Sequence, residues 1–181
     1  QVKALQMTLP GVAVRVKDAL MNLSEGNFSG DLAVQADHIA ILLPPNTPPM
    51  DGRLSMSAQV KGTGPGDLTA RLNMAVSRLK GLPPEVAAIA GPEVTLNAHA
   101  EMKKDRLTLE TVEMKGSQTR LTAHGWVNLE KSVFDVAYRM TLNHSGDGIS
   151  KPATLPVGDV KSQGKISGKF DDFAAYVDLN S

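Results

Sequence analysis

The chain has no cysteine, and only 4% of its residues are aromatic. The absence of cysteine excludes a disulfide framework and any metal site that depends on thiolate ligands. The 19 basic and 19 acidic residues balance, so no overall field favours nucleic acid or an anionic membrane surface. Few aromatic side chains are present for base stacking. We therefore expect no nucleic-acid partner.

Long apolar runs are also missing, since none approaches the roughly 18 residues that a membrane-spanning helix requires. The sequence starts at Gln1, without an initiator methionine or a signal peptide, and both of its ends lie close to repeated units. We expect residues 1–181 to form a single β segment built from repeats, as a fragment of a longer protein. Its apolar volume must come from Leu, Val, Ile, Ala and the 8 Met residues.

One short pattern occurs three times: a strand containing glycine, a polar turn, and then a strictly alternating strand. The copies span residues 58–76, 123–142 and 162–179. A repeated unit that cannot bury its own apolar face indicates units that stack on one another. We therefore expect the function to depend on an extended surface and not on a single pocket.

Alternation of apolar and polar residues with a period of two dominates the chain, as in Leu54, Met56 and Val60. It predicts a mainly β fold: an elongated, curved, antiparallel or mixed sheet of about ten strands with one apolar and one solvated face. Breaks in the phase at 34–41 and 107–114 predict a bulge or a turn near each.

Short helices and connections follow from the local residues. Pro83, Pro84 and Gly91 predict one short helix over 83–90, and residues 17–22 predict a second short helical turn. Turn residues predict hairpin connections at 62–67, 103–105, 116–118 and at Asp171–Asp172. The remaining connections are expected to be a stiff proline-rich loop over 44–49 and an irregular stretch over 145–156.

No arrangement of residues predicts catalysis. The histidines have no second histidine or carboxylate at a helical metal-ligand interval, and we interpret all four as solvent-facing or loop residues: His38, His99, His124 and His144. Asp147 lacks the further acidic ligands of a calcium loop. The glycine-rich stretch 62–66 is not followed by a helix that could hold a phosphate. We expect no enzyme activity, no cofactor and no metal.

The apolar alternation has two interpretations. It is the core of a closed sandwich or barrel, or it is an open face that binds an apolar ligand. Periodicity does not distinguish them, because an inward face has the same pattern in both cases. The abundance of Met, Leu, Val and Ala with few aromatics favours an acyl-chain lining slightly, since flexible Met accommodates varied partners.

Three stretches resemble TamB and AsmA-like proteins of the Gram-negative envelope. Residues 51–64 match a G-x-L-x-x-x-x-x-V-x-G-T unit followed by an alternating strand. Residues 82–96 are similar to a short helix leading into a Gly-Pro-x-hydrophobic strand, and residues 107–129 are similar to the hairpins of these proteins. The likeness extends from about residue 31 to residue 179.

The resemblance implies a taco-like β-sheet with a continuous hydrophobic groove, in the periplasm, within a protein anchored in the inner membrane. It implies a non-enzymatic role in cell-envelope biogenesis, in which the groove shelters phospholipid acyl chains during transport to the outer membrane. The alternative function is an assembly module for outer-membrane β-barrel or autotransporter proteins in protein secretion, which pairs strands with a client or a barrel partner. The third possibility is a purely structural sandwich. The residues expected to line the groove are Leu54, Met56, Val60, Leu72, Met74, Val94, Leu96, Met102, Leu121, Val127, Val136 and Met140.

Overall fold

The computed structural model describes residues 2–22, 24, 26–42, 50–64, 66–144 and 158–180. The loops expected over 44–49 and 145–156 lie outside the described residues. The described chain forms eleven strands: β1 (Val2–Leu9), β2 (Val12–Asn22), β3 (Asn27–Ala36), β4 (Asp51–Thr63), β5 (Asp67–Lys80), β6 (Val94–Lys103), β7 (Arg106–Lys115), β8 (Thr119–Asn128), β9 (Val133–His144), β10 (Gly158–Lys169) and β11 (Phe173–Asn180).

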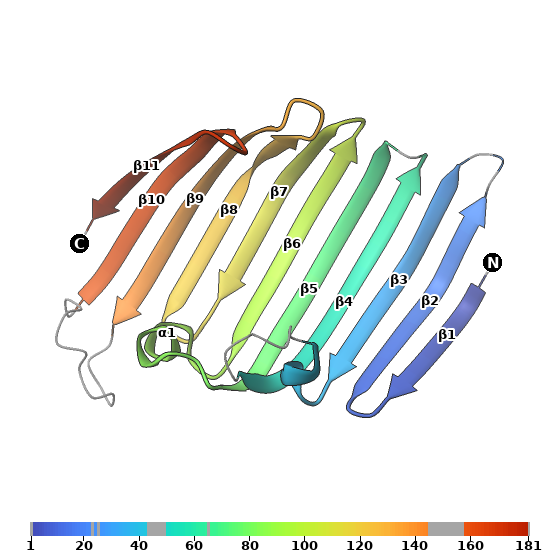
Figure 1. Cartoon of the computed structure of the whole chain (residues 1–181), viewed down its shortest axis with the longest axis horizontal. Coiled ribbons are helices and arrows are strands. Elements are labelled where there is room, and N and C mark those ends of the chain that lie inside the picture. The colour runs from blue at the N-terminus through green and yellow to red at the C-terminus, as the bar shows by residue number, and fades with distance from the viewer. Residues whose placement is uncertain are drawn as a thin grey trace.

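The strands form one open sheet in which each strand pairs with its neighbours in sequence order. Every pair of neighbouring strands is antiparallel. Figure 1 shows this meander as a single layer, with β1 and β11 at its two edges. The mainly β fold and the antiparallel pairing are thus confirmed, with eleven strands where about ten were expected.

Turn chemistry was a reliable guide to the connections. Hairpins join β4 to β5, β6 to β7, β7 to β8 and β10 to β11 at the positions expected from their turn residues. Lys104 adopts a φ of 53° in the two-residue β6–β7 turn, and a positive φ is what such tight hairpin turns require. Each of the three sequence repeats folds as a hairpin.

Two short helices lie at one end of the strands (Figure 1). α1 (Pro84–Ala90) begins with a proline in its first turn and is followed by Gly91 at a φ of 71°, so the helix expected at 83–90 is confirmed. The 3-10 helix η1 (Ile39–Leu42) follows β3 and accounts for the phase break at 34–41. The helical turn expected over 17–22 is wrong. That segment continues β2, and its irregular pattern comes from a register shift between Lys17 and Leu20.

The second phase break is a bulge in β7. Leu109 pairs with Ala100 and Gly125, whereas Val112 pairs with Ala98 and Ala123, so two residues of β7 stand between them. The extra residue returns the apolar side chains of β7 to one face, because a one-residue slip would otherwise move half of them to the other face. The bulge predicted over 107–114 is therefore confirmed.

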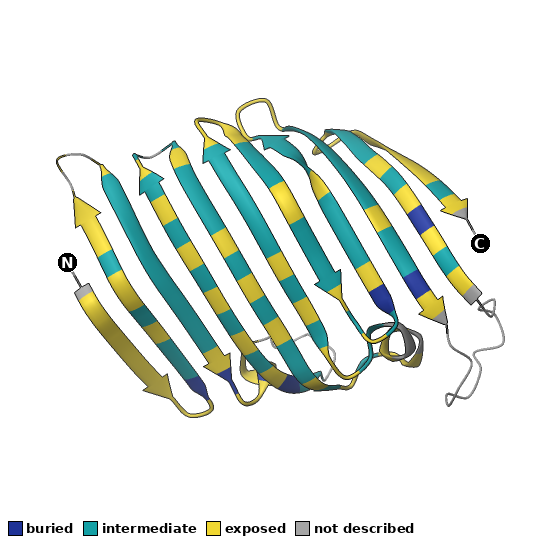
Figure 2. Ribbon diagram, turned by 180° about the vertical axis from the view of Figure 1, so that it is seen from behind, coloured by how far each residue is buried: buried dark blue, intermediate teal, exposed yellow. Residues whose placement is uncertain are grey.

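The sheet has very little buried core. Only four described apolar residues are largely hidden from solvent, and the most hidden of them, Ala36, still has 4% of its surface exposed; the four are Val12, Ala36, Ile39 and Leu142. No described large side chain is less than 2% exposed. Figure 2 shows half-buried and exposed residues alternating along the middle strands. In the described part of the chain, no second sheet or helical layer covers either face.

Candidate functional site on the apolar face

The register of the sheet places most apolar side chains on one face, whereas Leu20 of β2 and Trp126 of β8 lie on the other. Residues that lie directly opposite each other in an antiparallel pair project to the same side of the sheet. Each strand contributes apolar residues at alternate positions, and these positions are opposite one another from strand to strand. We call the resulting surface the apolar face and define it by Leu54, Met56, Ala58 and Val60 of β4 and their register partners.

One transverse row of this face can be followed through the whole sheet, with one residue from each strand. Its members are, from β1 to β11, Met7, Val14, Val34, Met56, Met74, Leu96, Met114, Leu121, Met140, Ser162 and Leu179. Ten of the eleven are apolar, and five are methionine out of 8 in the chain. We call it the methionine row. Its single polar member, Ser162, is only 4% exposed.

All twelve residues predicted to line a groove lie on the apolar face. Five belong to the methionine row: Met56, Met74, Leu96, Leu121 and Met140. The other seven occupy the neighbouring parallel rows: Leu54, Val60, Leu72, Val94, Met102, Val127 and Val136. The twelve are neither deeply buried nor fully exposed, as expected for side chains that touch only lateral neighbours on one side of a single layer.

The apolar face also includes residues that were not predicted. Val112 and Met114 of β7 were missed because the bulge interrupts their alternation. The apolar residues of the two edge strands were missed as well, although the same alternation was visible in Leu5, Met7 and Leu9. The face therefore extends to both edges, where Leu5 is 62% exposed and Leu179 is 69% exposed.

The uncovered apolar face is larger than the apolar patches that soluble proteins ordinarily expose. Eleven strands spaced about 4.8 Å apart, each about ten residues long at about 3.3 Å per residue, span roughly 50 Å by 30 Å. Soluble monomers rarely expose continuous apolar patches larger than about 300–600 Å². A face of this size, uncovered in the described part of the chain, is typical of a surface that binds an apolar partner.

Aromatic side chains cover glycines on the apolar face. The Phe28 ring lies over Gly62, and the Tyr138 ring lies over Gly164, where an added Cβ would come within 2.7 Å of Tyr138 Cε1. At the β9–β10 end the Phe134 ring packs against Phe170 and Phe173, with ring centroids 5.8 Å and 6.2 Å apart. These contacts bury apolar surface between neighbouring strands, and so replace part of the packing that a second layer would provide.

The opposite, polar face carries ion pairs that link neighbouring strands. Glu113 lies 3.3 Å from Lys115 Nζ and 2.6 Å from Arg120 Nη2. Hydrogen bonding from Lys115, and then from Arg120, lowers the pKa of Glu113. Lys165 pairs with Asp135 across β9 and β10 at 2.7 Å. These side chains are solvent-accessible and stabilise the sheet only modestly.

Two histidines have carboxylate partners that sequence spacing did not reveal. His99 Nδ1 lies 2.6 Å from Glu110 Oε2, at the β7 bulge, while its Nε2 is buried without a hydrogen-bond partner in the described structure. His38 Nδ1 lies 2.9 Å from Asp51 Oδ2, and this hydrogen bond lowers the pKa of Asp51. The first pair depends on the register of β6 and β7, and the second joins a residue just before η1 to the start of β4, so helical spacing rules represent neither.

Neither pair is part of a larger polar centre. Within the described residues, no group of three or more His, Asp or Glu side chains is placed to hold a metal ion. Among the same residues, no helix has the length and apolar character needed to cross a membrane. The candidate site is therefore the apolar face itself.

Comparison with known proteins found no matching family model, no matching curated protein and no matching solved structure.

Proposed function

We propose that this chain is a periplasmic segment of a TamB-like or AsmA-like envelope protein and that its apolar face shelters phospholipid acyl chains during transport between the membranes. The observation that carries the proposal is the methionine row and its parallel neighbours, which form an apolar surface across the eleven strands with one polar member of the row, Ser162. The proposal includes curvature of the sheet around the lipid tails, which would make this face a groove. No catalytic group is required.

Burial of an acyl chain provides the driving force. Each methylene group removed from water contributes about 0.8 kcal/mol. Leu, Val and Met side chains supply contacts without fixing one ligand shape, because unbranched Met adapts to varied surfaces. The headgroup remains in solvent, so a charged binding site is not needed on this face. The full protein would be anchored in the inner membrane, and the lipid would move toward the outer membrane.

A second candidate function follows from the edges of the sheet. The outer side of β11 has no partner strand in the described chain, and its exposed residues include Phe173, Tyr176, Val177 and Leu179. It contains no proline, lysine or arginine, the residues that commonly protect an edge from pairing. An edge of this kind suits strand addition by a client outer-membrane protein or a barrel partner.

Native mass spectrometry of the purified chain, followed by organic extraction and lipid analysis, tests the first proposal. We expect phospholipid to co-purify and to be lost from the Leu72→Asp variant, in which a charge lies on the apolar face. The matched variant Asn73→Asp changes the next residue, on the polar face, and should retain lipid. Lipid-free protein that captures unfolded outer-membrane protein would support strand addition instead.

A further inference from the structure

Among the described residues, Arg139 and Lys161 on the polar face have no carboxylate partner, unlike the nearby cations Lys115, Arg120 and Lys165. On β7 and β8, Lys115 and Arg120 converge on Glu113 at 3.3 Å and 2.6 Å. On β9 and β10, a similar pair is formed by Arg139 and Lys161. In this pair the residue opposite Arg139 on β10 is Gln163, which is uncharged.

The register places the two cations close together. Lys161 lies opposite Thr141, and Arg139 lies opposite Gln163, so Arg139 and Lys161 are diagonal neighbours. Such neighbours have Cα atoms about 7–8 Å apart, within reach of long side chains. Neither charged group has a carboxylate within ion-pair distance or a hydrogen bond in the described part of the chain. Like charges in neighbouring positions repel each other, and an anion bound between them relieves that repulsion.

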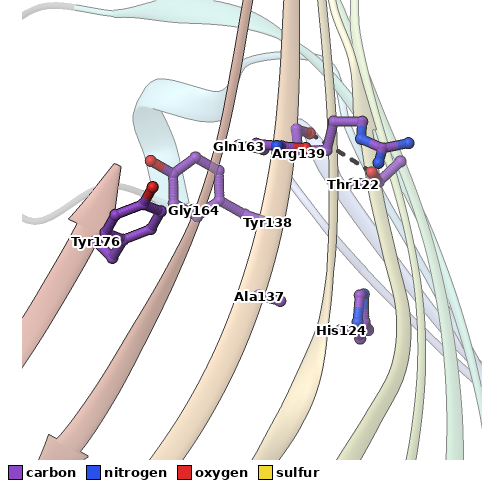
Figure 3. A pocket seen from close by; sticks show the side chains of 8 residues that line it. All are labelled: Thr122, His124, Ala137, Tyr138, Arg139, Gln163, Gly164 and Tyr176. Atoms are coloured by element: carbon purple, nitrogen blue, oxygen red, sulfur yellow. Dashed lines mark hydrogen bonds between the residues drawn. The ribbon is translucent and has the colours of Figure 1, made fainter. Parts of the chain in front are cut away.

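Two adjoining hollows share Arg139 and Gln163. The smaller, of about 340 Å³, is also lined by Thr141 and Lys161. The larger, of about 500 Å³, lies over Ala137, which has no side chain beyond Cβ to fill it. Figure 3 shows Arg139, Thr122 and His124 on one side of the larger hollow and Tyr176 on the other.

The absence of acidic residues distinguishes these two hollows from the others described on this sheet. No Asp or Glu lines either of them. The other three each include a carboxylate, from Asp37, Asp67 or Asp31. Two carboxylates lie near Lys161 by register without an ion pair to it: Asp159, two residues earlier on β10, and Asp178 on β11. Asp178 lies opposite Gln163 and accepts a hydrogen bond from Gln163 Nε2 at 3.3 Å. This bond holds the Gln163 carboxamide toward β11.

We propose that the polar face binds a phosphate group between Arg139 and Lys161. The Arg139 guanidinium donates paired hydrogen bonds to two phosphate oxygens, and the Lys161 ammonium neutralises a third. Gln163 and Thr141 supply further polar contacts, and the larger hollow gives room for the remainder of a phosphoester. Because the apolar face lies on the other side of the sheet, this ligand is a soluble phosphate compound and is independent of the lipid proposed above.

Titration with inorganic phosphate at constant ionic strength, followed by NMR of the backbone amides, tests this site. We expect saturable shifts confined to residues 137–141 and 161–163. Arg139→Gln and Lys161→Gln should each raise the dissociation constant by about tenfold or more, as expected for loss of a charge-assisted hydrogen bond. Unchanged spectra elsewhere would show that both variants keep the fold.

Lys61→Gln is the matched control, because Lys61 also lies on the polar face without an ion pair but lines a hollow that contains Asp67. This variant should leave phosphate affinity unchanged. The proposal is overturned by shifts that do not saturate and that spread over all cationic residues. It is equally overturned if Lys61→Gln weakens binding as much as Arg139→Gln does.

Discussion

Met56 of β4 and Met74 of β5 lie directly opposite each other on the apolar face. They belong to a row that crosses the sheet from β1 to β11, so the sulfur-containing side chains are aligned perpendicular to the strands. Unbranched thioether side chains adapt their shape to what they touch. This pairing links the repeats of the sequence to the proposed function, because each added hairpin lengthens the same apolar row.

A charge placed within the methionine row should abolish lipid binding without unfolding the sheet. Leu96→Asp introduces a carboxylate between Met74 and Met114. Burying that charge against an acyl chain costs several kcal/mol, so co-purified lipid should fall by more than about tenfold. Asn97→Asp, on the other face, should have no effect. Equal lipid in both variants, with unchanged circular dichroism, would argue against this use of the face.

Oxidation of the methionine row should have the same effect as an inserted charge, but more weakly. Hydrogen peroxide converts methionine to its sulfoxide, which is polar and disrupts methionine-rich interfaces. We expect progressive loss of lipid as sulfoxide accumulates, measured by mass spectrometry. Replacement of the five methionines of the row by leucine, at Met7, Met56, Met74, Met114 and Met140, should protect binding. Loss of lipid at the same rate in this variant would show that the row is not the binding surface.

Gly164 should not tolerate a side chain, because the Tyr138 ring covers it. A Cβ at Gly164 would lie 2.7 Å from Tyr138 Cε1 and would also meet the Tyr176 carbonyl oxygen. Overpacking of this kind costs about 1–3 kcal/mol, so Gly164→Ala should lower the urea midpoint. Ser167→Ala, on the polar side of the same strand, should stay within about 0.5 kcal/mol of the parent. Equal midpoints for the two variants would contradict this packing.

Glu113 should make part of the stability of the sheet dependent on pH. Lys115 and Arg120 lower its pKa in the folded state, so they favour its ionised form there. This stabilisation is present above the usual glutamate pKa and is lost as the pH falls through the lowered value. The free energy of unfolding of Glu113→Gln should therefore approach that of the parent in acid. If the free energies of unfolding of the parent and of Glu113→Gln differed by the same amount at about pH 6 and about pH 3, this role of Glu113 would be contradicted.

Much of the fold could be predicted from the sequence because the information was local. Alternation identified the strands, and Gly, Asp and Lys turns identified the hairpins. The helical turn expected over 17–22 was wrong because Asp18 adopts a φ of 51° within an irregular strand, which interrupts the alternation as a helix would. The pairs His99–Glu110 and His38–Asp51 could not be predicted. The first depends on the bulge in β7, and the second depends on how the residues just after β3 fold back on the start of β4.

The candidate site was predicted in its composition but not in its extent. Every residue proposed as lining lies on one face, because alternation fixes the side of a strand to which a residue projects. Whether that face is covered depends on a second layer, and periodicity carries no information about one. The predicted lining contained residues of β4, β5, β6, β8 and β9 only. It omitted β7, whose alternation is interrupted by the bulge, and it also omitted β1, β2, β3, β10 and β11, whose apolar residues continue the same rows.

A photo-crosslinking amino acid at Met74, with the same group at Asn73 as the control, tests the central claim most directly. Adjacent residues of β5 project to opposite faces of the sheet, so the two probes differ only in the face that they report. We predict that the probe at Met74 crosslinks to phospholipid in cells and that the probe at Asn73 does not. Crosslinking to lipid from both positions, or from neither, would contradict the account.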